Sequence, residues 1–132
     1  MVKSHLESLK INDISNVQTL ILYNIGEDKL TIGELTHRGY YLGSNVSYNV
    51  KKLVESEYLI QEQAVHDKRS SKVRLSEKGL NLYAKMDEFY DTTSNDLVAR
   101  RVPLEDLKRI NTTLLKLEKY WNNCISEMSR TF

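Results

Sequence analysis

Apolar residues in the first part of the chain recur about every three or four positions, which is the spacing of an amphipathic helix. A short first helix is predicted from the apolar positions Leu6, Leu9, Ile11 and Ile14. A second is predicted to follow the capping residue Ser15 and to end at Gly26, with apolar positions Val17, Leu20, Ile21 and Ile25. An extended piece around residues 29–32 then leads to a third helix, from Gly33 to about Arg38, which Thr31 can cap.

The middle segment YYLGSNVSYNVKKLVESEYL, residues 40–59, combines an apolar stripe with a polar and partly cationic face. The stripe consists of Leu42, Val46, Val50, Leu53 and Val54. This pattern predicts an amphipathic helix. The spacing then changes to the alternation of a β-hairpin, with a strand at residues 59–65, a turn at 66–70 and a return strand at 72–75.

Helical spacing returns at Ser76, a predicted N-cap, and continues to the end of the chain. A long helix toward Ala99 is predicted from Leu80, Tyr83, Met86, Phe89 and Tyr90. Pro103 fits the first turn of a final helix. The apolar stripe of that helix comprises Leu104, Leu107, Ile110, Leu114, Leu117, Trp121, Ile125 and Met128.

A stripe of this length needs a partner surface. Burial between two copies of the chain is the favoured prediction, and packing against the preceding helix alone is the alternative. The expected dimer contact involves the first and last helices. Its residues are Leu6, Leu9, Leu107, Leu114, Leu117, Trp121 and Ile125.

Length and composition fit one globular domain, since 132 residues with 40% hydrophobic and 28% charged residues can bury one core. The chain has no apolar run long enough to span a membrane and no apolar signal core, so a cytoplasmic location and no membrane partner are expected. A single cysteine and three isolated histidines predict neither a disulfide framework nor a zinc site. No metal and no cofactor are expected.

The net charge is only +1, so an interaction with nucleic acid must depend on where the charges lie. Residues 37–78 hold eight Lys or Arg and five Asp or Glu, a balance of +3. The remaining residues hold eleven against thirteen, a balance of −2. The basic part of the chain is therefore the part that contains the amphipathic helix and the hairpin.

This order of elements is that of a winged helix inside a frame of helices, where the wing is a β-hairpin. Residues 30–79 resemble the DNA-binding core of the MarR family of bacterial transcriptional regulators. The wing signature of that family is carried here by Asp67, Arg69, Val73, Leu75, Ser76 and Gly79, and SNVSYNVKKLVE resembles its recognition helix. The resemblance implies a mainly α fold with a small β-hairpin wing, and a homodimer that binds pseudo-palindromic operator DNA. A repressor is expected, but the residues do not distinguish repression from activation. A single domain over 1–132 would contain a winged helix-turn-helix core at 28–78 and a helical dimerisation region at 1–14 and 79–132.

One position departs from the family pattern. Glycine usually follows the recognition helix, whereas this chain has Glu57. Glycine permits a left-handed backbone there, which a glutamate adopts only at a cost of about 1 kcal/mol or more. The sequence therefore predicts a different end to this helix and a shift of the strand that follows.

A helix fits the major groove, where amides and hydroxyls can pair with base edges and lysines with phosphates or guanine. The polar positions expected to contact DNA are Ser44, Asn45, Ser47, Tyr48, Asn49, Lys51 and Lys52. Among them the two lysines are assigned to phosphates. The alternative is a merely solvated face, but two asparagines in mid-helix are poor helix formers that such a face would rarely carry.

The hairpin turn predicts a second DNA contact. An exposed arginine at a hairpin tip can enter a narrow, electronegative minor groove, so Arg69 is assigned there, with Lys68 and Lys72 on the flanking phosphates. Asp67 is expected to hold the turn or to orient Arg69. Arg38, with His37, could contact backbone phosphates, and ordinary surface charge is the alternative there.

Other functions have less support in the sequence. No phosphate-binding loop, nucleophile elbow or carboxylate pair near a histidine is present in a recognisable motif, so an enzyme is not expected. A winged-helix module that binds protein without DNA is the alternative, since the net charge is modest.

Members of the resembled family respond to small ligands in a cleft between winged core and dimer helices, or to thiol oxidation, so an effector of unknown identity is a possible partner. Tyr40, Tyr41, Tyr83 and Tyr90 could line such a cleft, but their helical spacing favours plain core. For Cys124 an unreactive thiol is favoured.

Overall fold

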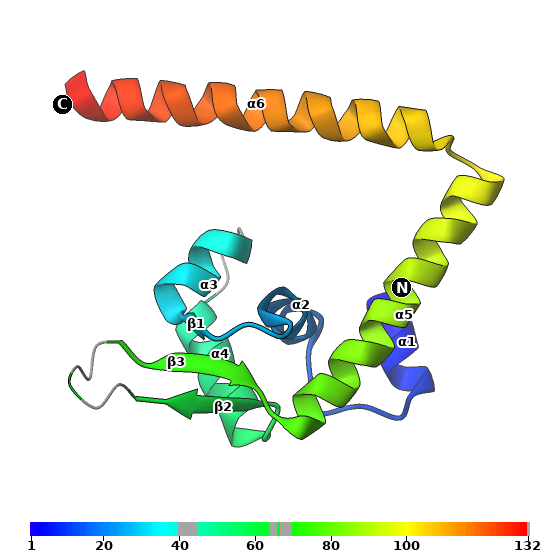
Figure 1. Ribbon diagram of the computed structural model, residues 1–132, viewed down its shortest axis with the longest axis vertical. Helices are drawn as coiled ribbons and strands as arrows, with labels where there is room; N and C mark the ends of the chain where they lie inside the picture. The colour runs from blue at the N-terminus through cyan, green and yellow to red at the C-terminus, as the bar shows by residue number, and fades with distance from the viewer. Residues whose placement is uncertain (40–44, 64–65, 67–69, 132) are drawn as a thin grey trace. The chain divides into compact units, whose positions relative to one another are not determined.

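The computed structural model describes residues 1–39, 45–63, 66 and 70–131 (Figure 1). In chain order its elements are α1 (Val2–Ser8), α2 (Asn16–Ile25), β1 (Leu30–Thr31), α3 (Ile32–Gly39), α4 (Val46–Glu55), β2 (Leu59–Glu62), β3 (Lys72–Leu75), α5 (Glu77–Arg100) and α6 (Leu104–Thr131). The chain divides into two compact units, Met1–Phe89 and Tyr90–Phe132. The predicted fold class, mainly α with a small β-hairpin, is confirmed.

The first unit contains an antiparallel sheet with the strand order β1-β3-β2. In the central strand Val73 and Leu75 are buried while Lys72 is exposed, which confirms the predicted alternation. Leu30 pairs with Val73, so the extended piece predicted at residues 29–32 is a third strand and not only a connection. The helices α2, α3 and α4 contact one another, and each also contacts the sheet (Figure 1).

The first helix ends earlier than predicted. The Lys10 backbone is left-handed, with φ of 58°. The Lys10 N–H donates to the Glu7 carbonyl and the Ile11 N–H donates to the Leu6 carbonyl, each over 3.0 Å. These are the two hydrogen bonds of a Schellman cap, which ends α1 at Ser8. Ile11 and the buried Ile14 therefore belong to the connection after α1.

The second helix begins at the predicted cap but buries a different face. The Ser15 hydroxyl accepts the Gln18 N–H over 3.2 Å, and the Gln18 side-chain oxygen accepts the Ser15 N–H over 2.9 Å, which completes a capping box. Val17 and Leu20, predicted to lie on the apolar face, are exposed, and Leu22 is buried instead. The predicted stripe of α2 is thus partly wrong.

Glu57 adopts the left-handed conformation that the family's glycine would adopt, with φ of 65°. The Glu57 N–H donates to the Val54 carbonyl over 3.0 Å, and the Tyr58 N–H donates to the Leu53 carbonyl over 2.9 Å. This is again a Schellman cap, and β2 begins at Leu59 without the predicted shift. The prediction that this helix would end differently is wrong, because the chain keeps the conformation despite its cost.

The start of α5 explains why Ser76 and Gly79 stand three positions apart in the sequence. The Ser76 hydroxyl accepts the Gly79 N–H over 3.0 Å, which confirms the predicted cap. A Cβ atom on Gly79 would lie 2.2 Å from the Tyr58 carbonyl oxygen, so only glycine allows this close approach of α5 to the end of α4. Further along α5, Leu82 is buried and Leu80 is exposed, contrary to the predicted stripe.

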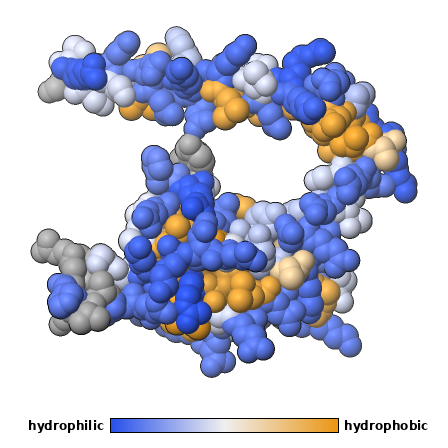
Figure 2. All heavy atoms as spheres, viewed as in Figure 1, coloured by the Kyte–Doolittle hydropathy of each residue, from blue (hydrophilic) through white to orange (hydrophobic). Residues whose placement is uncertain are grey.

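The second unit consists of the end of α5 together with α6. No residue of α6 is buried. Its large exposed apolar residues are Leu104, Ile110, Leu114, Leu115, Leu117, Tyr120, Trp121, Ile125 and Met128. Figure 2 shows apolar side chains open to the surface along this helix. None of the helices, over the residues that the structure describes, is long and apolar enough to cross a bilayer.

Candidate nucleic-acid interface

The helix α4 has two distinct faces. Val46, Val50 and Leu53 are buried on its inner face. Its exposed residues are Ser47, Tyr48, Lys51, Lys52 and Glu55. At 3.6 residues per turn these positions share one side of the helix, opposite the buried stripe. The predicted polar and partly cationic surface is therefore present on α4.

The two asparagines among the predicted DNA contacts make hydrogen bonds within the chain. The Asn45 side-chain oxygen accepts the Tyr48 N–H over 2.9 Å and caps α4. The Asn49 amide donates to the Asn45 carbonyl over 2.9 Å and accepts a hydrogen bond from the Gln18 side chain over 3.2 Å. The sequence interpretation missed these roles, although the preference of asparagine for N-cap positions is a signal for the first of them.

The two lysines of α4 differ in their surroundings. The Lys52 ammonium lies 3.2 Å from a Glu55 carboxylate oxygen and 5.7 Å from the centroid of the Tyr48 ring. Lys51 is exposed and forms no ion pair with any residue that the structure describes. An exposed ion pair contributes little free energy, so a phosphate can displace Glu55 from Lys52 at small cost.

The wing is described at its base only. Lys72, at the start of β3, is exposed. Glu62 of β2 pairs with Lys29, and one of its oxygens lies 2.8 Å from the Arg74 Nε atom. Hydrogen bonds from Lys29 and Arg74 lower the pKa of Glu62. In these pairs, which the sequence interpretation missed, the single negative charge of Glu62 is shared by two cations and offsets one of their two positive charges.

Three of the predicted DNA-contacting residues lie outside the described residues: Ser44, Lys68 and Arg69. Asp67, predicted to orient Arg69, also lies outside them. Their assignments stay predictions from the sequence.

Arg38, at the end of α3, is exposed but already has two partners within its own unit. Its guanidinium lies 2.6 Å from an Asp28 carboxylate oxygen and donates to the Asn24 carbonyl over 3.2 Å.

The other end of α3 has the predicted cap, since the Thr31 hydroxyl accepts the Glu34 N–H over 3.1 Å. In return the Thr31 N–H donates to the Glu34 carboxylate, which lowers the pKa of Glu34.

The residues considered for an effector response are only partly described. Tyr40 and Tyr41 lie outside the described residues. The Tyr83 ring packs against Gly26, and its centroid lies 5.4 Å from that of Tyr23, which supports the core interpretation for Tyr83. Burial raises the pKa of Tyr90.

Cys124 is a half-buried free thiol. The described residues contain no group of three His, Cys, Asp or Glu side chains placed to hold a metal.

Comparisons with known proteins agree with these features. A MarR family model matches residues 12–70, the range from the connection before α2 to the residues after β2. The exopolysaccharide II synthesis transcriptional activator ExpG of Rhizobium meliloti is 36% identical over 123 residues, which are 93% of this chain. This chain belongs to the MarR family. It spans about 63% of the length of that curated relative.

Solved MarR-type structures share the fold. The S. aureus MepR–DNA complex has a TM-score of 0.72 at 20% identity, over 90% of this chain and 88% of that one. Streptococcus pneumoniae FabT in complex with DNA has a TM-score of 0.71 at 15% identity, over 92% and 87%. The predicted resemblance to the MarR family is confirmed.

Proposed function

We propose that this MarR-family chain is a homodimeric, sequence-specific DNA-binding regulator of transcription. The observation that carries the proposal is the outer face of α4, where Ser47, Tyr48, Lys51 and Lys52 are exposed while the inner face is buried. An α-helix fits the major groove of B-DNA, which is about 12 Å wide. Two relatives of the same fold are known in complex with DNA, which supports this role.

The contacts of α4 divide by chemistry. Ser47 and Tyr48 carry hydroxyls that can pair with base edges, and Lys51 and Lys52 carry charges that suit phosphates. Asn45 uses its side-chain oxygen as a cap, so only its N–H donors are assigned to DNA, and Asn49 contributes its remaining amide hydrogen. Base discrimination in this proposal depends mainly on the hydroxyls.

The wing provides the second contact. Arg69 is assigned to the minor groove, with Asp67 orienting it and with Lys68 and Lys72 on the phosphates. Lys72 is exposed at the start of β3, where it could reach a phosphate beside the groove. Arg38 is assigned to a backbone phosphate, which would replace Asp28 as its ion-pair partner.

The dimer contact is assigned mainly to α6. Leu114, Trp121 and Ile125 are 56%, 58% and 61% exposed, which is unusual for large apolar side chains along one helix face. Leu107 and Leu117 continue the same stripe. Leu6 of α1 is buried within its own unit and Leu9 is half-buried, so α1 would add only its outer side.

A module that binds protein without DNA is the second candidate. The observation that favours it is that several cations of the first unit already have carboxylate partners: Lys29 and Arg74 on Glu62, and Arg38 on Asp28. Such pairs weaken the electrostatic attraction of the surface for DNA.

A salt titration separates the two candidates. A duplex is selected from a random-sequence pool with the wild-type protein, and its affinity is measured at increasing salt for wild type, Lys51→Ala and Lys85→Ala. Lys85 is an exposed cation on α5 and serves as the matched control. The expected slope of log affinity against log salt falls by about one for Lys51→Ala and stays unchanged for Lys85→Ala. Absence of any duplex binding at low salt would favour the protein-binding module.

A further inference from the structure

Both ends of α4 are joined by hydrogen bonds to one short segment of the chain, residues 13–18. This segment runs from the connection after α1 into the first turn of α2. It forms no part of the polar face of α4.

The C-terminal end of α4 is joined to the 13–18 segment through Tyr58, whose N–H belongs to the Schellman cap and which is only 3% exposed. The Tyr58 hydroxyl donates to an Asp13 carboxylate oxygen over 2.7 Å. The Lys78 ammonium lies 3.1 Å from the other Asp13 oxygen, 4.1 Å from the centroid of the Tyr58 ring and 2.8 Å from the Ser56 carbonyl. Partial burial opposes the charge on Asp13, but the hydrogen bonds from Tyr58 and Lys78 lower the pKa of Asp13.

The N-terminal part of α4 is joined to the same segment through Gln18. Its side-chain oxygen and backbone N–H are used in the capping box with Ser15. Its side-chain nitrogen donates to Asn49, whose amide in turn donates to the Asn45 carbonyl. A continuous chain of hydrogen bonds therefore runs from the 13–18 segment to the first turn of α4.

Apolar packing alone would not fix the position of α4. Val46, Val50 and Leu53 hold it against the core, but apolar contacts are not directional and permit small rotations and shifts. Hydrogen bonds are directional and weaken steeply when they bend.

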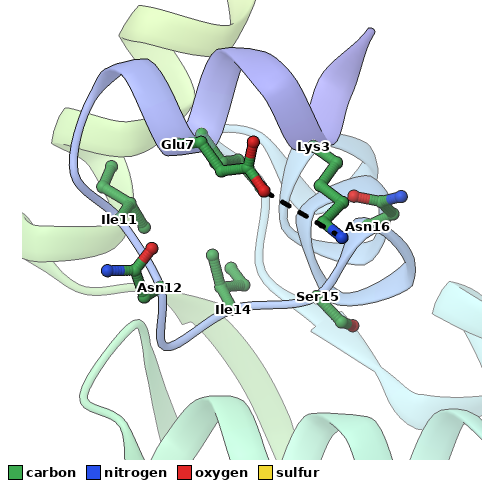
Figure 3. A pocket seen from close by; sticks show the side chains of 8 residues that line it. Lys3, Glu7, Ile11, Asn12, Ile14, Ser15 and Asn16 are labelled. Atoms are coloured by element: carbon green, nitrogen blue, oxygen red, sulfur yellow. Dashed lines mark ion pairs between the residues drawn. The ribbon is translucent and has the colours of Figure 1, made fainter.

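The other side of the segment is open. A pocket of about 330 Å³ separates it from α1 and is lined by Lys3, Leu6, Glu7, Ile11, Asn12, Ile14, Ser15 and Asn16 (Figure 3). Packing on that side is incomplete, so the hydrogen bonds to α4 and α5, together with the buried side chain of Ile14, hold the segment in place.

We propose that Asp13 and Gln18 are positioning residues that set the orientation of α4, so that discrimination between DNA sequences depends on two side chains that do not touch DNA. The inference rests on the proposed function of α4. It extends that function to a segment whose hydrogen-bond partners Asn49 and Tyr58 are 31 and 45 residues away in sequence.

The test compares two tyrosines. Tyr58→Phe removes the hydrogen bond to Asp13, whereas the control Tyr23→Phe removes a similar hydrogen bond, from Tyr23 to Asp87 over 3.0 Å, which joins α2 to α5. Affinity is measured for the duplex selected with wild type and for a scrambled duplex of the same composition. The ratio of the two affinities should fall about tenfold for Tyr58→Phe, the effect of losing one base contact, and stay within about twofold for Tyr23→Phe.

A rescue series separates positioning from general stability. Asp13→Asn keeps an oxygen that can accept the Tyr58 hydroxyl and should retain most of the ratio, whereas Asp13→Ala and Gln18→Ala should each lower it. Asp13 is exposed, so these variants keep the core intact if Tyr58→Phe unfolds. Thermal denaturation by circular dichroism checks that all variants are folded.

Three results are decisive. The expected reduction in Tyr58→Phe and Asp13→Ala, with Tyr23→Phe and Asp13→Asn close to wild type, supports the inference. Equal ratios for Tyr58→Phe and Tyr23→Phe, in a wild type that does discriminate, would overturn the inference and leave the proposed function standing. A wild-type protein that binds both duplexes equally would overturn both.

Discussion

Replacement of Glu57 by glycine is expected to stabilise the protein. Glu57 follows α4 with φ of 65°, a region in which the Cβ atom of an L-residue is crowded. Its N–H donates to the Val54 carbonyl, and its carbonyl accepts the Ser76 hydroxyl over 2.5 Å. Both are backbone groups, so glycine retains both hydrogen bonds, and only an exposed side chain is lost.

The magnitude follows from two opposing effects. Relief of the left-handed strain contributes about 1–2 kcal/mol to the free energy of unfolding. The greater freedom of glycine in the unfolded chain offsets about 0.5–1 kcal/mol of this. The net gain is therefore about 0.5–1 kcal/mol, which corresponds to a rise in Tm of about 2–5 °C for a protein of this size.

The assay is equilibrium unfolding in urea, followed by circular dichroism, for wild type, Glu57→Gly and Glu57→Ala. Alanine keeps the Cβ atom, so Glu57→Ala should lie within about 0.5 kcal/mol of wild type. Lys10→Gly, at the equivalent position after α1, should give a gain similar to that of Glu57→Gly. If Glu57→Gly is no more stable than Glu57→Ala, left-handed strain at this cap is not a cost to the fold.

Three further outcomes are expected. Leu114→Glu combined with Leu117→Glu should give monomers in sedimentation at micromolar concentration, because these exposed leucines form the proposed dimer contact; a monomeric wild type would contradict the dimer. Gly79→Ala should lose about 1–3 kcal/mol in urea unfolding, because its Cβ would lie 2.2 Å from a backbone oxygen, whereas Gly33→Ala has 3.9 Å of room and should cost nothing. In urea unfolding at several pH values, wild type should be more stable than Asp13→Ala above pH 3.8, the usual pKa of this carboxyl group. This advantage should disappear as the pH falls through the lowered pKa of Asp13 in the folded protein. A difference in stability that does not change with pH would contradict the direction of the pKa shift.

Local signals in the sequence predicted the boundaries of several elements. The caps at Ser15, Thr31 and Ser76 use hydrogen bonds between residues three positions apart, and the alternation in β3 is set by neighbours along one strand. Such features depend on a few adjacent residues, so the sequence contains what is needed to predict them.

The buried faces of helices could not be assigned in the same way. In α2 and α5 the apolar residues cover more than one face, and the spacing alone does not distinguish Leu20 from Leu22 or Leu80 from Leu82. The choice depends on which elements pack against each helix. At Glu57 a local signal gave the wrong prediction. A glutamate is unfavourable in a left-handed backbone, so the sequence suggested a changed end of α4. The cap hydrogen bonds and the close approach of Gly79 to the Tyr58 carbonyl accompany the left-handed conformation that is kept.

The candidate site was predictable as a surface but not as a network. The spacing of Val46, Val50 and Leu53 predicts the inner face of α4 and therefore its outer polar face. The hydrogen bond from Gln18 to Asn49 joins residues 31 positions apart, and no pattern along the chain indicates it. Pairs of this kind become visible only when the tertiary structure is known.

The central claim is that α4 of two copies enters successive major grooves of one duplex. Methylation interference at guanine N7, an atom of the major groove, tests this directly on the duplex selected with the wild-type protein. We expect methylation to prevent binding at two clusters of guanines with centres about 10 base pairs apart, or a multiple of that spacing, as for a symmetric dimer. Binding that is unaffected by methylation at any guanine N7 would contradict the account.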